Sequence, residues 1–274
     1  MSTLNMPEKT MPPAMILCGG KGTRLREVTE LLPKPMVSIG EQPIVWHIMK
    51  SYAAFGVRRF ILCLGYKKEA FVDYFTNYHL RTADATIRLG NEPEITFHGK
   101  SNEADWEVTF ANTGKDSMTG YRVFEASKYL KKEDENFFLT YGDGVSDVNI
   151  AELYQSHLKN DSMVTITAVH PEARFGQLVL ENEKVKRFDE KPPRGEGYIN
   201  GGFMVMKKDF ISRYLTNDKD LFLERAPLQN AAQDGEMGVF RHEGFWQCMD
   251  NQREYGMLND LWNSGNAPWT KYWK

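Results

Sequence analysis

Apolar positions along the chain follow two different periods. Continuous apolar runs at Met15–Leu17, Arg59–Leu64 and Asn136–Tyr141 predict strands that are covered on both faces. Between the first two and after the second, apolar residues recur at helical spacing, over Ile44–Phe55 and again over Lys68–Phe75. Strand, helix, strand, helix from the N-terminus is the opening of a doubly wound sheet, so the pattern predicts an α/β fold.

The segment 80–115 departs from this alternation. Its short strand-like stretches, separated by Gly, Asn and Pro, predict a small β excursion from the main sheet. The second half returns to alternating elements, with a hairpin expected over 175–190 and a strand over 201–206. No linker rich in Pro, Ser or Gly divides the chain, so we expect one domain over 14–274 after a flexible tail at 1–13.

Composition is that of a soluble globular protein and limits the partners. Of 274 residues, 41% are hydrophobic and 26% charged, with a net charge of −3. This charge gives no reason to expect nucleic acid or an anionic membrane, so a polyanion must be held by local cations or a metal. No apolar run reaches about 18 residues, and 1–13 has no signal-peptide core, so we expect a cytoplasmic protein. The three distant cysteines are expected to be reduced thiols.

Three glycines in four positions follow the first predicted strand, at Gly19, Gly20 and Gly22, with Thr23 and Arg24 directly behind them. Glycine lets the backbone turn and approach a ligand closely. A row of free N–H groups beside cations suits a polyphosphate. The spacing matches neither a P-loop nor G-x-G-x-x-G, and an ordinary tight β–α turn is the alternative interpretation.

Two aspartates end strand-like runs on separate segments, Asp143 after Asn136–Tyr141 and Asp250 after Gly244–Met249. Because ligands of an open α/β sheet bind outside the carboxyl ends of its strands, both are well placed to hold Mg²⁺. The alternatives are an Asp-Gly turn for Asp143 and a helix N-cap for Asp250. No zinc spacing and no Ser-His-Asp arrangement competes, and His47 is expected in the core or an interface.

Six motifs occur in order along the chain: G-G-x-G-T-R-L from Gly19, K-P-M from Lys34, G-D-G-V from Gly142, E-K-P from Glu190, N-G-G-F from Asn200 and F-W-Q-x-M-D ending at Asp250. Together they resemble the signature of the sugar-1-phosphate nucleotidylyltransferases, and the resemblance runs from Ala14 to the C-terminus. It implies a Rossmann-like doubly wound mixed sheet of the nucleotide-diphospho-sugar transferase type, with a small β excursion and a sugar-binding C-terminal part. The segment TYGDGV, with INGGF and GFWQ-x-MD, looks more like the CTP-using branch than the dTTP- or UTP-using branches, and the substrates of that branch are CTP and α-D-glucose 1-phosphate.

The resemblance also implies a role for each matching residue. The implied nucleotide-binding residues are Leu17, Cys18, Gly19, Gly20, Lys21, Gly22, Thr23, Arg24, Lys34, Ser117, Arg122 and Gly142. The implied sugar-binding residues are Glu190, Lys191, Asn200, Gly201 and Gly202. Arg24 and Lys34 would hold the triphosphate and Lys191 the attacking phosphate, and these three are the implied catalytic residues. Asp143 and Asp250 would hold Mg²⁺. Tyr121 stands where the branch commonly has glycine, and its side chain is expected to alter the loop before Arg122.

A homo-oligomer is also implied by the resemblance, with a hexamer as one candidate. The excursion at 80–115 and the aromatic C-terminal tail point the same way. Two alternative functions remain: the same reaction with dTTP, UTP or another sugar phosphate, and a non-catalytic regulatory subunit on the same fold. A regulatory subunit should have lost the metal carboxylates or phosphate lysines, and this chain keeps them. A dinucleotide-dependent oxidoreductase is disfavoured by the glycine spacing.

Overall fold

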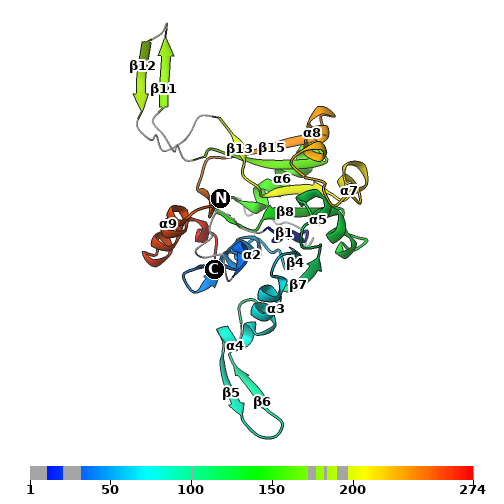
Figure 1. The fold of residues 1–274 in the computed structure, drawn as a ribbon, viewed down its shortest axis with the longest axis vertical. Helices are drawn as coiled ribbons and strands as arrows, with labels where there is room; N and C mark the ends of the chain where they lie inside the picture. The colour runs from blue at the N-terminus through cyan, green and yellow to red at the C-terminus, as the bar shows by residue number, and fades with distance from the viewer. Residues whose placement is uncertain are drawn as a thin grey trace, which may run out of the picture.

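A mixed eight-stranded sheet forms the centre of the protein (Figure 1). The computed structural model describes residues 11–20, 32–99, 101–171, 177–181, 184–189 and 197–273. In spatial order the strands of the sheet are β13 (Ile199–Asn200), β10 (Val164–Val169), β14 (Met204–Lys207), β8 (Asn136–Tyr141), β1 (Ala14–Leu17), β4 (Arg59–Leu64) and β7 (Glu107–Asn112), and β15 (Met237–His242) pairs with β10.

The strands β8, β1, β4 and β7 form a continuous parallel run in this sheet, and β10 and β15 form a second parallel pair. In β1, Leu17 lies opposite Tyr141 of β8 on one side and Cys63 of β4 on the other. Side chains of β1 are buried at every position, as predicted for a parallel strand covered on both faces. The carboxyl ends of these strands therefore meet at one edge of the sheet.

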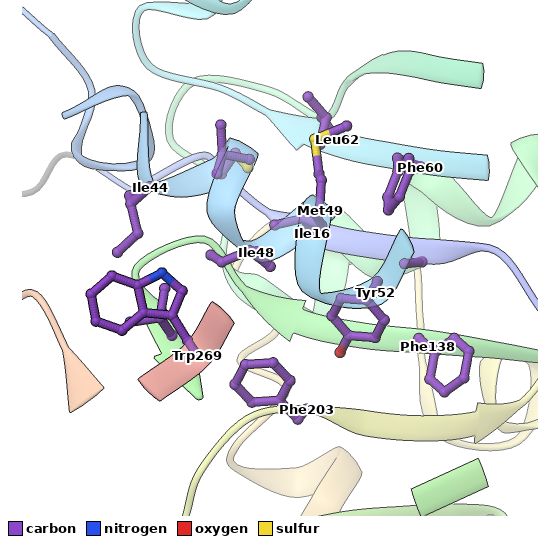
Figure 2. Close-up of a cluster of buried hydrophobic side chains, with 14 of the residues drawn as sticks. Ile16, Ile44, Ile48, Met49, Tyr52, Phe60, Leu62, Phe138, Phe203 and Trp269 are labelled. Carbon is purple, nitrogen blue, oxygen red and sulfur yellow. The ribbon is translucent and has the colours of Figure 1, made fainter. Parts of the chain in front are cut away.

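Helices cover both faces of the sheet. One face is covered by α2 (Ile44–Ala53), α3 (Lys68–Thr76), α4 (Tyr78–Thr82), α6 (Ile150–Asn160), α9 (Gln252–Asn263) and the 3-10 helix η4 (Pro268–Thr270). The other face is covered by α5 (Thr119–Ala126), α7 (Asp209–Tyr214) and α8 (Ala226–Gln233). Because strand side chains alternate, Ile16 of β1 enters the first core and Met15 the second. Figure 2 shows the first core, in which Tyr52 of α2 lies among Phe138, Phe203 and Ile16.

The segment β13–β14 behaves as one strand with a break. The predicted strand over 201–206 is wrong at its start, because regular pairing of β14 begins only at Met204. Gly202 has φ +75° and Phe203 has φ +38°, so the backbone is left-handed at both positions. The hydroxyl of Thr167 donates to the Phe203 carbonyl at 2.6 Å and fixes the break.

A short antiparallel ribbon, β9 (Gly144–Ser146) with β16 (Trp246–Cys248), lies beside the sheet. Its register places Cys248 opposite Gly144. At the other end, Asp147 Oδ1 accepts the Phe245 N–H at 2.6 Å and lies 2.9 Å from His242 Nε2. Burial opposes ionisation of Asp147, but the His242 contacts and the Phe245 N–H outweigh it and lower the pKa of this carboxyl. The ribbon is thus held in one register.

Among the strands that the structure describes, two hairpins pair only within themselves: β5–β6 (Asp84–Arg88, Glu94–His98) and β11–β12 (Gln177–Glu181, Lys184–Asp189). Figure 1 shows them standing away from the body at opposite ends. The second is the hairpin expected over 175–190. The first is the predicted excursion, but its expected bounds of 80–115 are too wide, because β7 belongs to the main sheet.

His47 of α2 lies in an aromatic cluster formed by the C-terminal segment. Its ring is fully buried and contacts Trp262, Trp269 and Trp273 at centroid distances of 4.7, 6.0 and 5.6 Å. Trp269 Nε1 donates to His47 Nδ1 at 3.2 Å, and His47 Nε2 lies 2.9 Å from the Ile39 carbonyl. Burial lowers the pKa of His47 to about 4. The residue is therefore a neutral core histidine, as expected.

The cysteines are free thiols, with Cys18 and Cys63 buried and Cys248 half-buried. No helix in the described ranges combines the length and apolar character needed to cross a bilayer.

Candidate active site

A pocket of about 730 Å³ opens at the carboxyl edge of the parallel strands. Its lining residues are Leu17, Gly19, Gly20, Lys34, Pro35, Lys115, Asp116, Ser117, Met118, Thr119, Arg122, Tyr141, Gly142, Asp143 and Asp250. The pocket thus brings together most of the predicted nucleotide-binding residues that the structure describes, and both predicted metal ligands. Cys18 lies beneath it, since a Cβ on Gly142 would come within 3.2 Å of its sulfur.

Lys34 sits between the two aspartates. Its Nζ is 2.6 Å from Asp143 Oδ2 and also forms an ion pair with Asp250 Oδ1. The Lys34 side chain is 11% exposed, so burial opposes its charge, but the two carboxylates prevail and raise its pKa above the ordinary value. The site therefore holds one lysine cation against two carboxylate anions.

Local sequence explains where Lys34 lies. It begins the 3-10 helix η2 (Lys34–Met36), and Pro33 is the N-cap at φ −67° and ψ 147°. Proline fixes φ on both sides of Lys34 and restricts the residue before it, which directs the lysine inward. The segment continues into the pair β2 (Ser38–Ile39) and β3 (Gln42–Pro43), where Gly40 N–H donates to Asn259 of α9 at 2.9 Å. The segment that carries Lys34 and the helix after Asp250 are thus tied together.

The ribbon β9–β16 accounts for the meeting of Asp143 and Asp250. Asp143 precedes β9 and Asp250 follows β16, and the Met249 N–H donates to the Asp143 carbonyl at 2.8 Å. The N-cap interpretation of Asp250 is wrong, because the side chain of Asn251 caps α9 by accepting the Glu254 N–H at 3.0 Å. The Asp250 carboxylate is directed at Lys34 instead.

This donor set fits a hard divalent cation. Both carboxylates already converge on a single cation, the Lys34 ammonium, so their oxygens share one cation-binding position. Carboxylate oxygens with phosphate and water oxygens form the coordination that Mg²⁺ prefers. A thiol group also lies near, because Cys248 Sγ is 3.6 Å from Asp250 Oδ2. Burial, reinforced by neighbouring carboxylates, raises the pKa of Cys248 to about 12, which disfavours a thiolate ligand.

The glycine turn after β1 is held by Arg122. This buried guanidinium donates to the Gly19 carbonyl at 3.2 Å, the Gly114 carbonyl at 2.8 Å and Thr113 Oγ1 at 2.9 Å. A Cβ on Gly19 would come within 2.1 Å of the guanidinium, so only glycine fits against it. Burial lowers the pKa of Arg122. Arg122 lines the pocket, but its described hydrogen bonds go to the protein's own turns.

The predicted effect of Tyr121 on the loop before Arg122 is wrong. Tyr121 lies inside the first turns of α5, where any side chain can leave the helix. The restrictive position is Gly120, where a Cβ would approach Leu221 Cγ and the Leu221 carbonyl at 2.9 Å. Ser117 precedes this helix, lines the pocket and is 8% exposed, in a place consistent with a nucleotide contact.

The sugar-side residues that the structure describes lie in the break between β13 and β14. Asn200 Oδ1 accepts the Gly202 N–H at 2.9 Å, and the Gly201 carbonyl accepts Trp246 Nε1 at 2.7 Å. Gly202 packs against the Tyr141 ring, where a Cβ would lie 3.0 Å from Cδ2. Six predicted site residues lie outside the described residues: Lys21, Gly22, Thr23, Arg24, Glu190 and Lys191.

Sequence reasoning missed several residues at this edge, since the pocket is also lined by Pro35, Lys115, Asp116, Met118, Thr119 and Tyr141. Tyr141 lines the pocket and could have been found as the residue directly before the Gly-Asp pair. Glu224 accepts the Tyr141 hydroxyl at 2.7 Å, yet nothing in its local sequence distinguishes it from a surface glutamate.

A doubly wound mixed sheet with a glycine turn after its first strand and paired carboxylates at the same edge defines a nucleotide-transferring enzyme. The family model described as "Nucleotidyl transferase" matches residues 13–247, and the chain belongs to this family. The chain is 44% identical over 261 residues to the "Glucose-1-phosphate cytidylyltransferase" of Salmonella typhi, spanning 95% of this chain and 99% of the relative.

A "Probable glucose-1-phosphate cytidylyltransferase" of Bacillus subtilis is 41% identical over 260 residues, with the same coverage of 95% and 99%. Among solved structures, HddC from Yersinia pseudotuberculosis superposes with a TM-score of 0.66 at 25% identity, covering 92% of this chain and 100% of that one. The predicted family and fold class are confirmed.

Proposed function

We propose that the protein transfers the cytidylyl group of CTP to α-D-glucose 1-phosphate, giving CDP-glucose and pyrophosphate. The observation that carries the proposal is the convergence of Lys34, Asp143 and Asp250 beside the Gly19–Gly20 turn. This arrangement suits transfer between phosphates, which needs charge neutralisation and alignment more than covalent help. The base and the sugar come from the relatives, whose names specify cytidylyl transfer to glucose 1-phosphate.

In the proposed reaction a phosphate oxygen of glucose 1-phosphate attacks the α-phosphorus of CTP in line. The new oxygen–phosphorus bond forms as the bond to the β-phosphate breaks, and the electron pair leaves with pyrophosphate. No general base is needed, because the attacking oxygen is already anionic near neutral pH.

Lys34 supplies a permanent positive charge in this reaction, because its raised pKa keeps the ammonium protonated. Gly19 and Gly20 let the nucleotide approach the backbone, and Arg122 fixes the carbonyl of the first of them. Bound between Asp143 and Asp250, Mg²⁺ would neutralise phosphate charge during the transfer. Arg24 is proposed to assist on the triphosphate and Lys191 on the sugar phosphate, from their motif positions.

A substrate matrix tests the proposal. Purified protein is incubated with Mg²⁺, each of CTP, UTP, dTTP, ATP and GTP, and either glucose 1-phosphate or mannose 1-phosphate. Pyrophosphate release is measured, and the nucleotide sugar is identified by mass spectrometry. We expect the highest kcat/KM for CTP with glucose 1-phosphate. A higher value for another pair would contradict the specificity, and no release from any pair would leave the regulatory-subunit alternative.

We also propose that the protein forms a homo-oligomer through the β5–β6 hairpin. Three apolar side chains of this isolated hairpin, Ile87, Ile95 and Phe97, are between 43% and 48% exposed, and Leu89 beside it is 91% exposed. Apolar exposure of this kind is typical of association surfaces. Light scattering on the wild type and on an Ile87→Ser, Leu89→Ser variant measures the state. A variant of unchanged mass would contradict this role for the hairpin.

A further inference from the structure

A chain of hydrogen bonds runs along the pocket from the nucleotide side to the sugar side. Glu224 lies in the loop before α8, and both of its carboxylate oxygens are used. Oε2 accepts the Thr119 hydroxyl at 2.6 Å, and Oε1 accepts the Tyr141 hydroxyl at 2.7 Å. Tyr141 in turn lies 3.4 Å from Asn200 Nδ2. We refer to Tyr141, Glu224 and Thr119 as the relay.

One end of the relay, Thr119, lies on the side of the pocket that we propose binds the nucleotide. Thr119 lines the pocket and is the first residue of α5, whose opening turn is built around Gly120. Thr119 Oγ1 accepts the Leu223 N–H at 2.9 Å, and Gly120 N–H donates to the Leu221 carbonyl at 2.9 Å. The loop that carries Glu224 is therefore joined to this side of the pocket by backbone as well as side-chain contacts.

The other end of the relay, Tyr141, contacts the break between β13 and β14, on the side that we propose binds the sugar. The Tyr141 ring lies against Gly202, and Asn200 uses its Oδ1 on the Gly202 N–H. Burial, followed by the charge and hydrogen bond of Glu224, raises the pKa of Tyr141, so its phenol stays a neutral donor. A shift of Glu224 would therefore move the groups on which the sugar-side backbone rests.

Glu224 is shared between the two halves of the pocket, because one carboxylate oxygen accepts from Thr119 and the other from Tyr141. A substrate that shifts Thr119, or that shifts Asn200 and Tyr141, therefore also shifts this shared carboxylate. The second substrate then meets partners already moved to their liganded positions, so less of its binding free energy is used to move them.

We propose that Glu224 is a positioning residue that couples the two halves of the pocket, so that nucleotide and sugar phosphate each strengthen binding of the other. This inference rests on the proposed function, because it takes Thr119 to face the nucleotide and Asn200 the sugar.

The test measures binding of glucose 1-phosphate by calorimetry with and without saturating α,β-methylene-CTP, an unreactive analogue, in the presence of Mg²⁺. We expect the analogue to tighten binding at least about fivefold in the wild type. Glu224→Ala and Tyr141→Phe should reduce this factor to near one. Glu224→Ala should still bind each ligand alone within about threefold of the wild type, because Glu224 does not line the pocket and carries no phosphate-binding charge. Glu224→Gln should retain most of the coupling, since its amide can accept from Tyr141 and donate to Thr119.

Tyr214→Phe is the matched control. It removes a phenol that donates to Asp234 at 2.9 Å between α7 and the end of α8, far from the pocket lining, and should leave the coupling unchanged. The inference is overturned by wild-type coupling in folded Glu224→Ala, by the absence of coupling in the wild type, or by loss of binding of either ligand alone in Glu224→Ala. If the wild type releases no pyrophosphate from CTP and glucose 1-phosphate, the proposed function fails as well. Normal release with unaltered coupling in Glu224→Ala overturns this inference alone.

Discussion

Replacing Arg122 with methionine keeps most of the apolar stem and removes the guanidinium that holds the glycine turn. Its five acceptors in the structure are Gly114 O, Thr113 Oγ1, Gly19 O, Leu64 O and Lys115 O, at 2.8, 2.9, 3.2, 3.3 and 3.4 Å. The Leu64 carbonyl keeps a second donor, the Thr113 N–H at 2.9 Å. Among the described residues, the carbonyls of Gly19, Gly114 and Lys115 have the guanidinium as their donor.

The expected loss follows from those three carbonyls. A hydrogen bond lost from a buried group costs about 1–3 kcal/mol, and we take the lower end because the pocket admits water. The sum is roughly 3 kcal/mol, reduced somewhat because burial of the Arg122 charge is itself unfavourable, as its lowered pKa indicates. A loss of about 2–3 kcal/mol corresponds to a fall in Tm of roughly 4–12 °C, at about 2–4 °C per kcal/mol for a large domain.

Denaturant unfolding and calorimetry with CTP measure the two consequences together. We expect Arg122→Met to lose stability and at least about tenfold in nucleotide affinity, because the Gly19 peptide is no longer fixed. Arg213→Met is the control, since this exposed arginine pairs with Asp234 and Glu236 at the surface and its replacement should change stability little. A variant with wild-type stability that no longer binds CTP would refute the reasoning and make Arg122 a direct nucleotide contact.

Three further substitutions test other parts of the structure. Asp143→Asn should reduce kcat by at least about a hundredfold and raise the Mg²⁺ concentration needed for pyrophosphate release, because one of the two proposed charged ligands is lost. Activity within about tenfold of the wild type would count against the metal site. His157 is buried and its pKa is lowered, mainly by burial, from 6.5 to about 4. Folding thus favours the neutral imidazole. The contribution of this residue to the free energy of unfolding is fully present above pH 6.5 and falls by about 3 kcal/mol as the pH decreases toward 4. Urea unfolding of His157→Gln should show a correspondingly shallower decline between pH 7 and 4, and parallel curves would refute the assignment. Gly120→Ala should lower Tm, because overpacking against Leu221 costs about 1–3 kcal/mol. Gly256→Ala in α9 is the control and should raise Tm, because a Cβ there meets nothing within 4 Å and alanine favours the helix. The opposite order of the two Tm values would contradict the packing at Gly120.

Local patterns were sufficient to predict the centre of the fold. The apolar runs of β1, β4 and β8 are buried at nearly every position, as expected for strands covered on both faces. The position of Asp143 also followed from chain order, because a carboxylate after a parallel strand must lie at the ligand-binding edge. The prolines around Lys34 signalled a restricted lysine, though not its two partners.

Features that depend on distant contacts could not be predicted in the same way. The break at Gly202 and Phe203 interrupts an apolar run that reads as one continuous strand, and it exists because Thr167 and Tyr141 hold it there. The N-cap of α9 is Asn251, whereas the carboxylate of Asp250, the residue before it, binds Lys34. Glu224 acquires its importance from partners 83 and 105 positions away, which no local pattern encodes.

The aromatic cluster around His47 has an optical consequence. The chain contains six tryptophans, and Trp46, Trp262, Trp269 and Trp273 all lie against that one imidazole. Intrinsic fluorescence of the protein is therefore expected to change when the C-terminal segment leaves α2. Trp246 lies in a different place, because its indole donates to the Gly201 carbonyl at the sugar-side loop. A change in emission on sugar binding is therefore expected from Trp246, and a change on detachment of the C-terminus from the tryptophans around His47.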